Sequence, residues 1–279
     1  MIKIKSQDEI EIMRQGGKIL ASILLAVAKE VKPGVSTKYL DELAERLIYE
    51  KGALPGFKGF DGYPATLCTS VNEEIVHALP SGRQLKEGDI LGLDLGVLWP
   101  PSLAGLESSL ARTPESCATC AMAAGCRKQK SMFTDAALTV AVGKVSSEAK
   151  KIIEVARGAL DLAVSKIKPG KKLSEVSSAV EKYVKQQGFL VIRDLVVHGI
   201  GYKLHEAPEI PNFAGHHFKD VVLKEGMTLA IEPMISAGSH KIKKTKDKHG
   251  YATQDNSLAA HFEHTVVVTK KGCEILTKN

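Results

Sequence analysis

The sequence predicts an α+β domain made of two similar halves, in which helices cover one face of a joined sheet. The first observation is a repeated stretch: residues 85–97 read LKEGDILGLDLGV, and residues 223–235 read LKEGMTLAIEPMI. The second is a repeated order of helix, helix and strands, in which Lys-Pro-Gly follows the first helix both times, ending at Gly34 and at Gly170. A period of about 136 residues is too long for a solenoid repeat and therefore indicates two halves of one domain.

The helices are predicted from apolar residues at helical spacing and from their end signals. Ser6 and Glu9 have the spacing of a capping box, and the Lys-Pro-Gly sequences stop the first helix of each half. The expected helices cover residues 6–30, about 36–51, 147–167 and a segment ending at Gln187. Strand-like runs follow each pair, at residues 67–76, 90–97 and 133–142, and then at 190–197, 227–235 and 262–269.

We expect a single domain over residues 1–279, with halves at about 1–143 and 144–279. The hydrophobic share of 44% is ordinary for a globular protein with a core. No apolar run approaches ~18 residues and no signal-peptide core precedes the first helix, so a cytoplasmic protein without a membrane span is predicted. The net charge of +6 fits an anionic partner but is more typical of a merely soluble surface. The Lys-rich residues 240–250 predict a solvated hairpin loop.

An atypical insertion at about residues 99–131 interrupts the repeat. It separates Asp94 from Asp135 and contains Cys117, Cys120 and Cys126. A hairpin tip tolerates extra residues because loop length adds only about (3/2)RT ln n to the entropy cost. A closed zinc site needs four ligands, so a mobile loop with free thiols is favoured over a zinc or redox element.

A carboxylate stands six residues after the turn glycine in each repeat, Asp94 after Gly88 and Glu232 after Gly226. A carboxylate in an apolar strand is costly to bury unless a cation or hydrogen bonds compensate it. With Asp135, His198 and Glu263 these residues form a set of four carboxylates and one imidazole, which can hold two divalent ions. Taken singly, each is as well explained by an ordinary polar or packed residue. The repeat, which aligns Asp94 with Glu232 and Asp135 with Glu263, favours the joint metal site.

At these residues the chain resembles a known family, the type I methionine aminopeptidases of the pita-bread metallopeptidases. The matching motifs are Tyr63-Pro64 with Cys68-x-Ser70-x-Asn72-Glu73-x-x-x-His77-x-x-Pro80, Asp94-Leu-Gly, Phe133-Thr-Asp135, His198-Gly-Ile-Gly201, His205-Glu-x-Pro208, Ile231-Glu-Pro-Met234 and Phe262-Glu-His-Thr265. The likeness covers nearly the whole chain except the insertion. It implies a pita-bread fold, with pseudo-twofold halves around a curved antiparallel sheet.

The resemblance implies removal of the N-terminal methionine from nascent chains by a hydroxide that two divalent ions (Co, Mn, Fe or Zn) activate. The implied metal ligands are Asp94, Asp135, His198, Glu232 and Glu263. Glu232 is also implied to relay the proton, and His77 and His205 are implied to be catalytic residues that contact the substrate. The implied methionine pocket is lined by Phe60, Tyr63 and Cys68. Leu204 stands where some members carry Phe, and His249 roughly where many carry Trp. The expected protein is a monomer that meets nascent chains, and its basic patches suggest the ribosome surface. Neither a membrane nor a specific nucleic-acid sequence is expected as a partner.

Two other functions remain open from the sequence. A proline-specific pita-bread peptidase usually carries a large N-terminal domain, whereas this chain starts almost at once with the repeat. A non-catalytic binding module would be expected to have lost ligands, and all five are present. The insertion keeps the second alternative open, because a shift of one residue in strand register would turn Asp135 to the wrong face.

Overall fold

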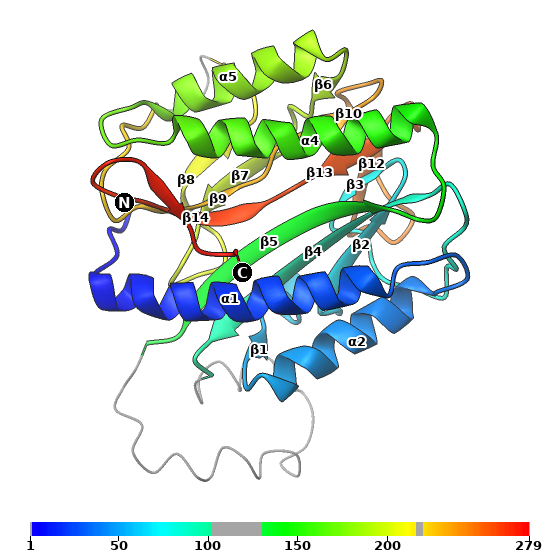
Figure 1. Cartoon of the computed structure of the whole chain (residues 1–279), viewed down its shortest axis with the longest axis horizontal. Coiled ribbons are helices and arrows are strands. Elements are labelled where there is room, and N and C mark those ends of the chain that lie inside the picture. Colours follow the sequence, from blue (N-terminus) through cyan, green and yellow to red (C-terminus); the bar gives the residue numbers. More distant parts are fainter. Residues whose placement is uncertain (1, 102–129, 216–219, 279) are drawn as a thin grey trace.

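The computed structural model describes residues 2–101, 130–215 and 220–278. Its helices form two pairs, and the strands run between and behind them (Figure 1). The first half contains α1 (Gln7–Lys29), α2 (Thr37–Glu50), β1 (Leu54–Pro55), the 3-10 helix η1 (Phe60–Gly62), β2 (Leu67–Val71), β3 (Glu74–Val76), β4 (Ile90–Trp99) and β5 (Met132–Ala141). The second half contains α4 (Ser147–Lys166), α5 (Leu173–Gln186), β6 (Leu190–Val191), β7 (Val196–Gly199), β8 (Glu206–Pro211), β9 (Thr228–Ile231), β10 (Met234–Ser236), β11 (Ile242–Lys244), β12 (Tyr251–Thr253), β13 (Ala259–His261), β14 (His264–Val268) and β15 (Cys273–Ile275).

The helix ends follow the signals in the sequence. Ser6 and Glu9 form the predicted capping box, in which each side chain accepts a hydrogen bond from the other residue's backbone N–H. Ser36 and Ser146 cap α2 and α4 in the same way, each accepting from the backbone N–H three residues on. Among the described residues, each helix end that was predicted therefore lies within a residue or two of the observed one.

The duplication is visible in equivalent hydrogen bonds. Gly34 N–H donates to Leu85 O over 2.8 Å, and Gly170 N–H donates to Leu223 O over 2.9 Å. Both bonds join the loop between a pair of helices to the Leu-Lys-Glu-Gly turn of the same half. The turn glycines, Gly88 and Gly226, have φ values of 94° and 80°, a region that glycine enters without steric cost. The predicted pseudo-twofold arrangement is thus confirmed at the level of individual turns.

Across residues 2–101, 130–215 and 220–278, the strands form four hydrogen-bonded sets rather than one uninterrupted ladder. The longest pairing joins β4 and β5 over their whole length, with Asp94 opposite Ala137 and Gly96 opposite Asp135. The register therefore places Asp94 and Asp135 on one face, and the disruption considered from the sequence does not occur. Most of the insertion, including its three cysteines, lies outside the described residues.

The two halves meet where β5 runs beside β13 and β14. Ala137 and Glu263 exchange two backbone hydrogen bonds, of 3.4 and 2.9 Å. On one side of this pair, the Thr265 hydroxyl accepts from Asp135 N–H and donates to Asp135 O, over 2.9 and 2.8 Å. On the other side, the Thr139 hydroxyl accepts from His261 N–H and donates to His261 O, over 3.1 and 2.7 Å.

This reciprocal pair of threonine contacts corrects one detail of the predicted alignment. Thr265 contacts Asp135 as Thr139 contacts His261, so Asp135 and His261 occupy equivalent positions in the two halves. Ala137 and Glu263 are equivalent in the same way. The sequence comparison instead aligned Asp135 with Glu263. Sequence spacing could not resolve this two-residue offset, because the insertion changes the length of one hairpin. A shift of two residues also leaves each side chain on the same face of its strand, so the alternation of faces does not reveal it.

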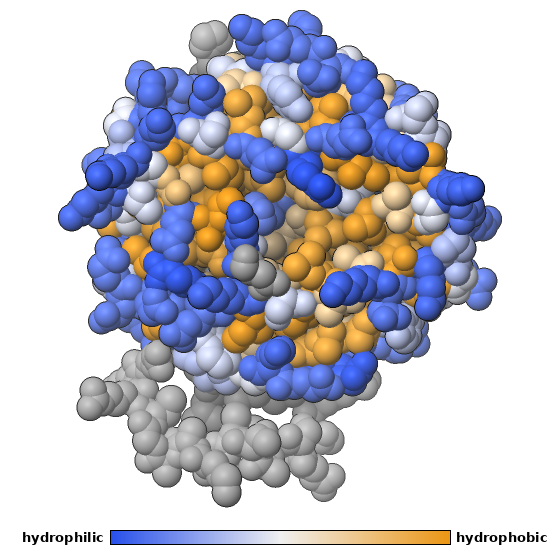
Figure 2. All heavy atoms as spheres, in the orientation of Figure 1, coloured by the Kyte–Doolittle hydropathy of each residue, from blue (hydrophilic) through white to orange (hydrophobic). Residues whose placement is uncertain are grey.

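Each half has its own apolar core, and a third cluster joins them. Leu20, Leu40 and Leu93 belong to the core of the first half. In the second half, α4 packs against β9 and β10, and α5 packs against β6 and β8. The third cluster contains Met13 from α1 and Ile200 from the loop after β7. Apolar side chains gather over the middle of the face seen in Figure 2, and hydrophilic side chains border them.

The Lys-rich segment forms the predicted hairpin, with β11 and β12 paired antiparallel. Lys241, Lys243 and Lys246 on it are exposed. Among the described helices, none has both the length and the apolar character needed to cross a bilayer.

Candidate metal centre

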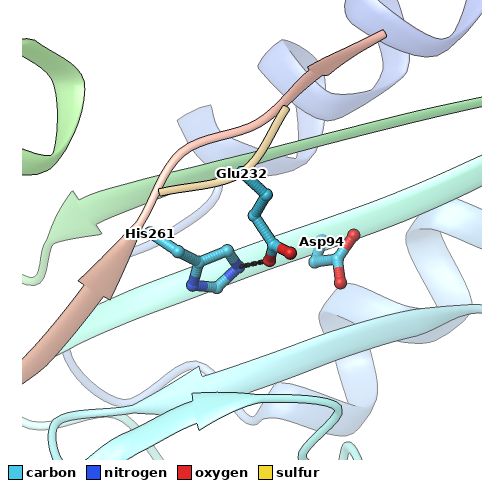
Figure 3. A group of neighbouring side chains, drawn as sticks. All are labelled: Asp94, Glu232 and His261. Carbon is cyan, nitrogen blue, oxygen red and sulfur yellow. Dashed lines mark ion pairs between the residues drawn. The ribbon is translucent and has the colours of Figure 1, made fainter. Parts of the chain in front are cut away.

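Six side chains from both halves converge as two groups of three. Asp94, Glu232 and His261 form one group, and Asp135, His198 and Glu263 form the other. Within each group the possible ligand atoms all lie within 4.8 Å of one another. Figure 3 shows the first group, in which the Glu232 carboxylate lies between the Asp94 carboxylate and the His261 ring. All five ligands predicted from the sequence are therefore brought together, and one further residue joins them.

The strands position these residues in two ways. Asp94 and Asp135 lie within the continuous strands β4 and β5. Glu232 lies in the break between β9 and β10, and Glu263 in the break between β13 and β14. His198 lies on β7, where the register shifts at Gly199. The glycine allows the backbone of the next strand to approach closely, since a Cβ on Gly199 would lie 2.3 Å from Ala207 O.

The centre concentrates negative charge in a region shielded from water. Burial raises the pKa of Asp94 and Asp135 well above the ordinary value, and a neighbouring carboxylate raises each further. Burial also raises the pKa of Glu232 and Glu263, and the other acidic groups add to the effect. Such a cluster is unfavourable in the ionised form unless cations compensate it.

The residues present fit divalent metal ions. Asp94 Oδ1, Asp135 Oδ1 and His261 Nε2 are buried and have no hydrogen-bond partner among the described residues. His198 uses Nδ1 to bond Gly199 O over 3.0 Å, which leaves Nε2 available as a ligand. A hydrogen bond from the second ring nitrogen is the usual device that orients a metal-binding histidine. Oxygen and imidazole donors together suit Mn, Fe, Co or Zn.

His261 belongs to one of these groups, although the sequence analysis did not place it among the candidate ligands. It stands directly before the matched motif Phe262-Glu-His-Thr265, and residues two apart in a strand share a face. That alternation could have identified it, because His261 stands two residues before the predicted ligand Glu263. Burial lowers the pKa of His261 to about 3, so the ring is neutral and can donate a lone pair to a cation.

His205 and His77 both lie at the solvent-exposed side of the centre. The His205 ring centroid is 4.1 Å from that of His198, and the Phe60 ring contacts His205 edge-on at 4.9 Å. His77 has a positive φ of 61° and faces the Tyr251 ring at 6.2 Å. Loss of hydration lowers the pKa of His77 to about 4 and also lowers the pKa of His205, so both rings are neutral near pH 7.

Comparison with known proteins identifies this arrangement. The pattern of metallopeptidase family M24 matches residues 11–113 and 107–270. The chain belongs to metallopeptidase family M24. It is 40% identical over 278 residues to methionine aminopeptidase 1 of Bacillus subtilis (strain 168), covering 100% of both chains. It is 35% identical to the methionine aminopeptidase of Escherichia coli (strain K12), covering 99% of this chain and 94% of the relative.

The structural comparison confirms the predicted pita-bread fold. The crystal structure of methionine aminopeptidase from Thermotoga maritima superposes with a TM-score of 0.86 at 38% identity, over 100% of both chains. The prolidase from Pyrococcus horikoshii OT3 superposes with a TM-score of 0.70 at 23% identity. This chain covers only 63% of that prolidase, so the second likeness shows a shared fold alone. The predicted resemblance to type I methionine aminopeptidases is therefore confirmed.

In this M24 chain, the three predicted pocket residues lie together beside the metal centre. Cys68 is buried in the cluster that joins the halves, and Phe60 and Tyr63 pack against that cluster. Tyr63 donates its hydroxyl hydrogen toward Leu67 O and Ala78 O, each at 3.2 Å. Burial raises the pKa of the Cys68 thiol well above its ordinary value, so it is a small apolar surface rather than a nucleophile.

The two residues that depart from the family pattern adjoin the same region. Leu204 is buried in the cluster that contains Cys68. The His249 ring contacts the Tyr63 ring edge-on at 5.8 Å, which agrees with its predicted position beside the pocket. Tyr251, which the sequence analysis did not single out, contacts His77.

Proposed function

We propose that this M24 metallopeptidase is a methionine aminopeptidase that removes the N-terminal methionine from nascent polypeptides. The observation that carries the proposal is the convergence of two candidate ligand groups beside an apolar cluster, with carboxylate and imidazole atoms that have no hydrogen-bond partner among the described residues. Full-length relatives that bear this name support the substrate. We further propose that the whole chain is one catalytic domain with halves at about residues 1–143 and 144–279.

Two divalent ions are proposed as the cofactor. The proposed ligands are Asp94, Asp135, His198, Glu232 and Glu263, and the fit of these groups supports them. When bound, such ions supply an activated water and compensation for the charge that develops on the scissile carbonyl oxygen. The choice among Co, Mn, Fe and Zn is left to measurement.

The chain's own residues have distinct proposed roles. Glu232 takes a proton from the attacking water and passes it to the leaving amine, which suits a carboxylate whose pKa burial raises. His205 donates a hydrogen bond to the developing oxyanion, a role that its position against the His198 ring supports. His77, which also lies at the exposed side of the centre, contacts the leaving nitrogen.

The proposed methionine pocket consists of Phe60, Tyr63 and Cys68. An apolar surface with aromatic edges suits a thioether, which is polarizable and packs favourably against rings. The Tyr63 hydroxyl is occupied by two backbone carbonyls, so it presents its ring rather than a polar group.

A peptide assay tests the proposal. Metal-depleted protein is incubated with Mn or Co and with peptides that begin Met-Ala or Met-Gly, alongside Xaa-Pro peptides of equal length. We expect methionine to be released from the first set alone. Cleavage before proline would instead indicate a prolidase activity. No cleavage by folded protein with either metal would overturn the proposal.

A further inference from the structure

We infer that His261 is a metal ligand, whose Nε2 binds the divalent ion held by Asp94 and Glu232. The inference rests on the proposed function, since it concerns the same centre. It changes the ligand set from four carboxylates with one imidazole to four carboxylates with two. Each of the two groups then offers two carboxylates and one imidazole.

The position of the ring is the first argument. His261 Nε2 is buried and has no hydrogen-bond partner within the part of the chain that the structure describes. It lies 3.8 Å from Glu232 Oε1, which is too far for a hydrogen bond. Figure 3 shows the ring with this nitrogen directed at the Glu232 carboxylate. A buried nitrogen that points into a group of carboxylates and bonds none of them is poorly explained as a structural contact.

The strand beside the ring leaves room for it. Gly92 lies on β4 two residues before Asp94, so both residues share a face. A Cβ on Gly92 would lie 2.6 Å from His261 Cε1 and 3.2 Å from His261 Nδ1. The absence of a side chain at Gly92 therefore allows the ring to occupy its present place.

The backbone of His261 is fixed as firmly as that of a predicted ligand. Thr139 bonds the N–H and O of His261 in the way that Thr265 bonds the N–H and O of Asp135. The pseudo-twofold relation thus pairs His261 with Asp135, which belongs to the other ligand group. His261 occupies, in the second half, the place that a carboxylate ligand occupies in the first.

The second imidazole has a consequence for metal choice. Imidazole nitrogen favours Fe, Co, Ni and Zn, whereas an all-oxygen site suits Mn and Mg. We therefore expect the Asp94–Glu232–His261 group to prefer cobalt over manganese. An oxygen donor at position 261 should make that preference smaller.

X-ray absorption of the protein loaded with two equivalents of Co²⁺ tests the inference directly, because outer-shell scattering counts imidazole ligands. The wild-type protein is expected to show about one imidazole per cobalt ion. Replacement His261→Gln should halve that number and weaken cobalt binding about tenfold or more. The matched control His240→Gln removes a histidine from the β11 side of the molecule and should change neither value.

A second variant leaves every ligand chemically intact. Gly92→Ala introduces the Cβ that collides with the His261 ring, and it should reproduce the lower imidazole count. If the wild-type protein binds two cobalt ions with a total of only one imidazole ligand, the inference is overturned and the proposed function is untouched. Failure of the wild-type protein to take up cobalt would overturn both the inference and the proposed function. If a variant does not fold, the spectrum of the wild-type protein alone tests the inference.

Discussion

The two halves of the molecule contribute to the centre in different ways. The first half supplies Asp94 and Asp135 from continuous, paired strands. The second half supplies Glu232 and Glu263 from breaks between strands. An aspartate on a continuous strand holds its carboxylate close to the backbone, whereas a glutamate at a break has one more methylene to orient. A duplicated fold can therefore keep one centre while its halves reach it by different local geometry.

Loss of a ligand from the second half should have the largest effect. Glu232→Ala removes both a proposed metal ligand and the proposed proton carrier, so kcat/KM for Met-Ala peptides should fall by about 10³-fold or more. Steady-state kinetics with circular dichroism as a control for folding provide the measurement. Activity within tenfold of wild type would remove Glu232 from the mechanism.

The N-terminal segment tests how the halves depend on each other. Lys5 precedes the first helix, yet its Nζ lies 2.6 Å from Glu206 Oε2 in the second half, with both side chains nearly inaccessible. Lys5→Ala leaves a buried carboxylate unpaired and should reduce the free energy of unfolding by about 3–5 kcal/mol in urea denaturation. Lys38→Ala breaks the exposed pair with Glu42 and should cost less than about 1 kcal/mol. Equal losses would show that the buried pair has no special role.

Exchange of the carboxylates sharpens the comparison directly. Asp94→Glu lengthens a side chain on a continuous strand, and Glu232→Asp shortens one at a break. If each length suits its own backbone, both variants should lose about 10–100-fold in affinity for one metal ion. Isothermal titration with Co²⁺ measures the loss. Unchanged affinity in both variants would mean that side-chain length and strand geometry are unrelated here.

The two threonine contacts offer a smaller, matched test. Thr265→Val and Thr139→Val each leave a buried backbone N–H and C=O without the hydroxyl, and each should cost about 1–3 kcal/mol of stability. Because Thr139 holds His261 and Thr265 holds Asp135, each variant should also weaken the corresponding metal group. Denaturation and cobalt titration of both proteins compare them, and a stability loss in only one would contradict the reciprocal arrangement.

The pH dependence of metal binding should follow the raised pKa values of the four carboxylates. A raised pKa means that the metal-free centre retains protons, so metal uptake releases them and affinity rises with pH. His198 and His261 have pKa values of about 3, so they are neutral at pH 6 and release nothing. Calorimetry at pH 6 in two buffers of different ionisation enthalpy should show net proton release. Identical heats would contradict it.

Much of the fold could be predicted from the sequence because its signals are local. The capping serines and the turn glycines fix helix ends and turns within a few residues of themselves. The repeated stretch then pointed to Asp94 and Glu232 as partners, although they are far apart in the chain. Asp135, His198 and Glu263 joined them as polar residues of the same kind, and the family motifs matched all five.

The relation between Asp135 and His261 could not be predicted in the same way. It depends on hydrogen bonds between β5 and β13, which no spacing in the chain encodes. The room for the His261 ring depends on Gly92, on a strand of the other half. Such features arise only when the halves pack together, so sequence reasoning reached the ligands one by one but not their grouping.

Both halves together are proposed to hold two catalytic metal ions. Elemental analysis of metal-depleted protein after equilibration with Co²⁺ and removal of free ion measures this most directly. The account predicts two cobalt ions per chain, with methionine release from Met-Ala peptides restored in proportion to uptake. Folded protein that retains no cobalt would contradict the account.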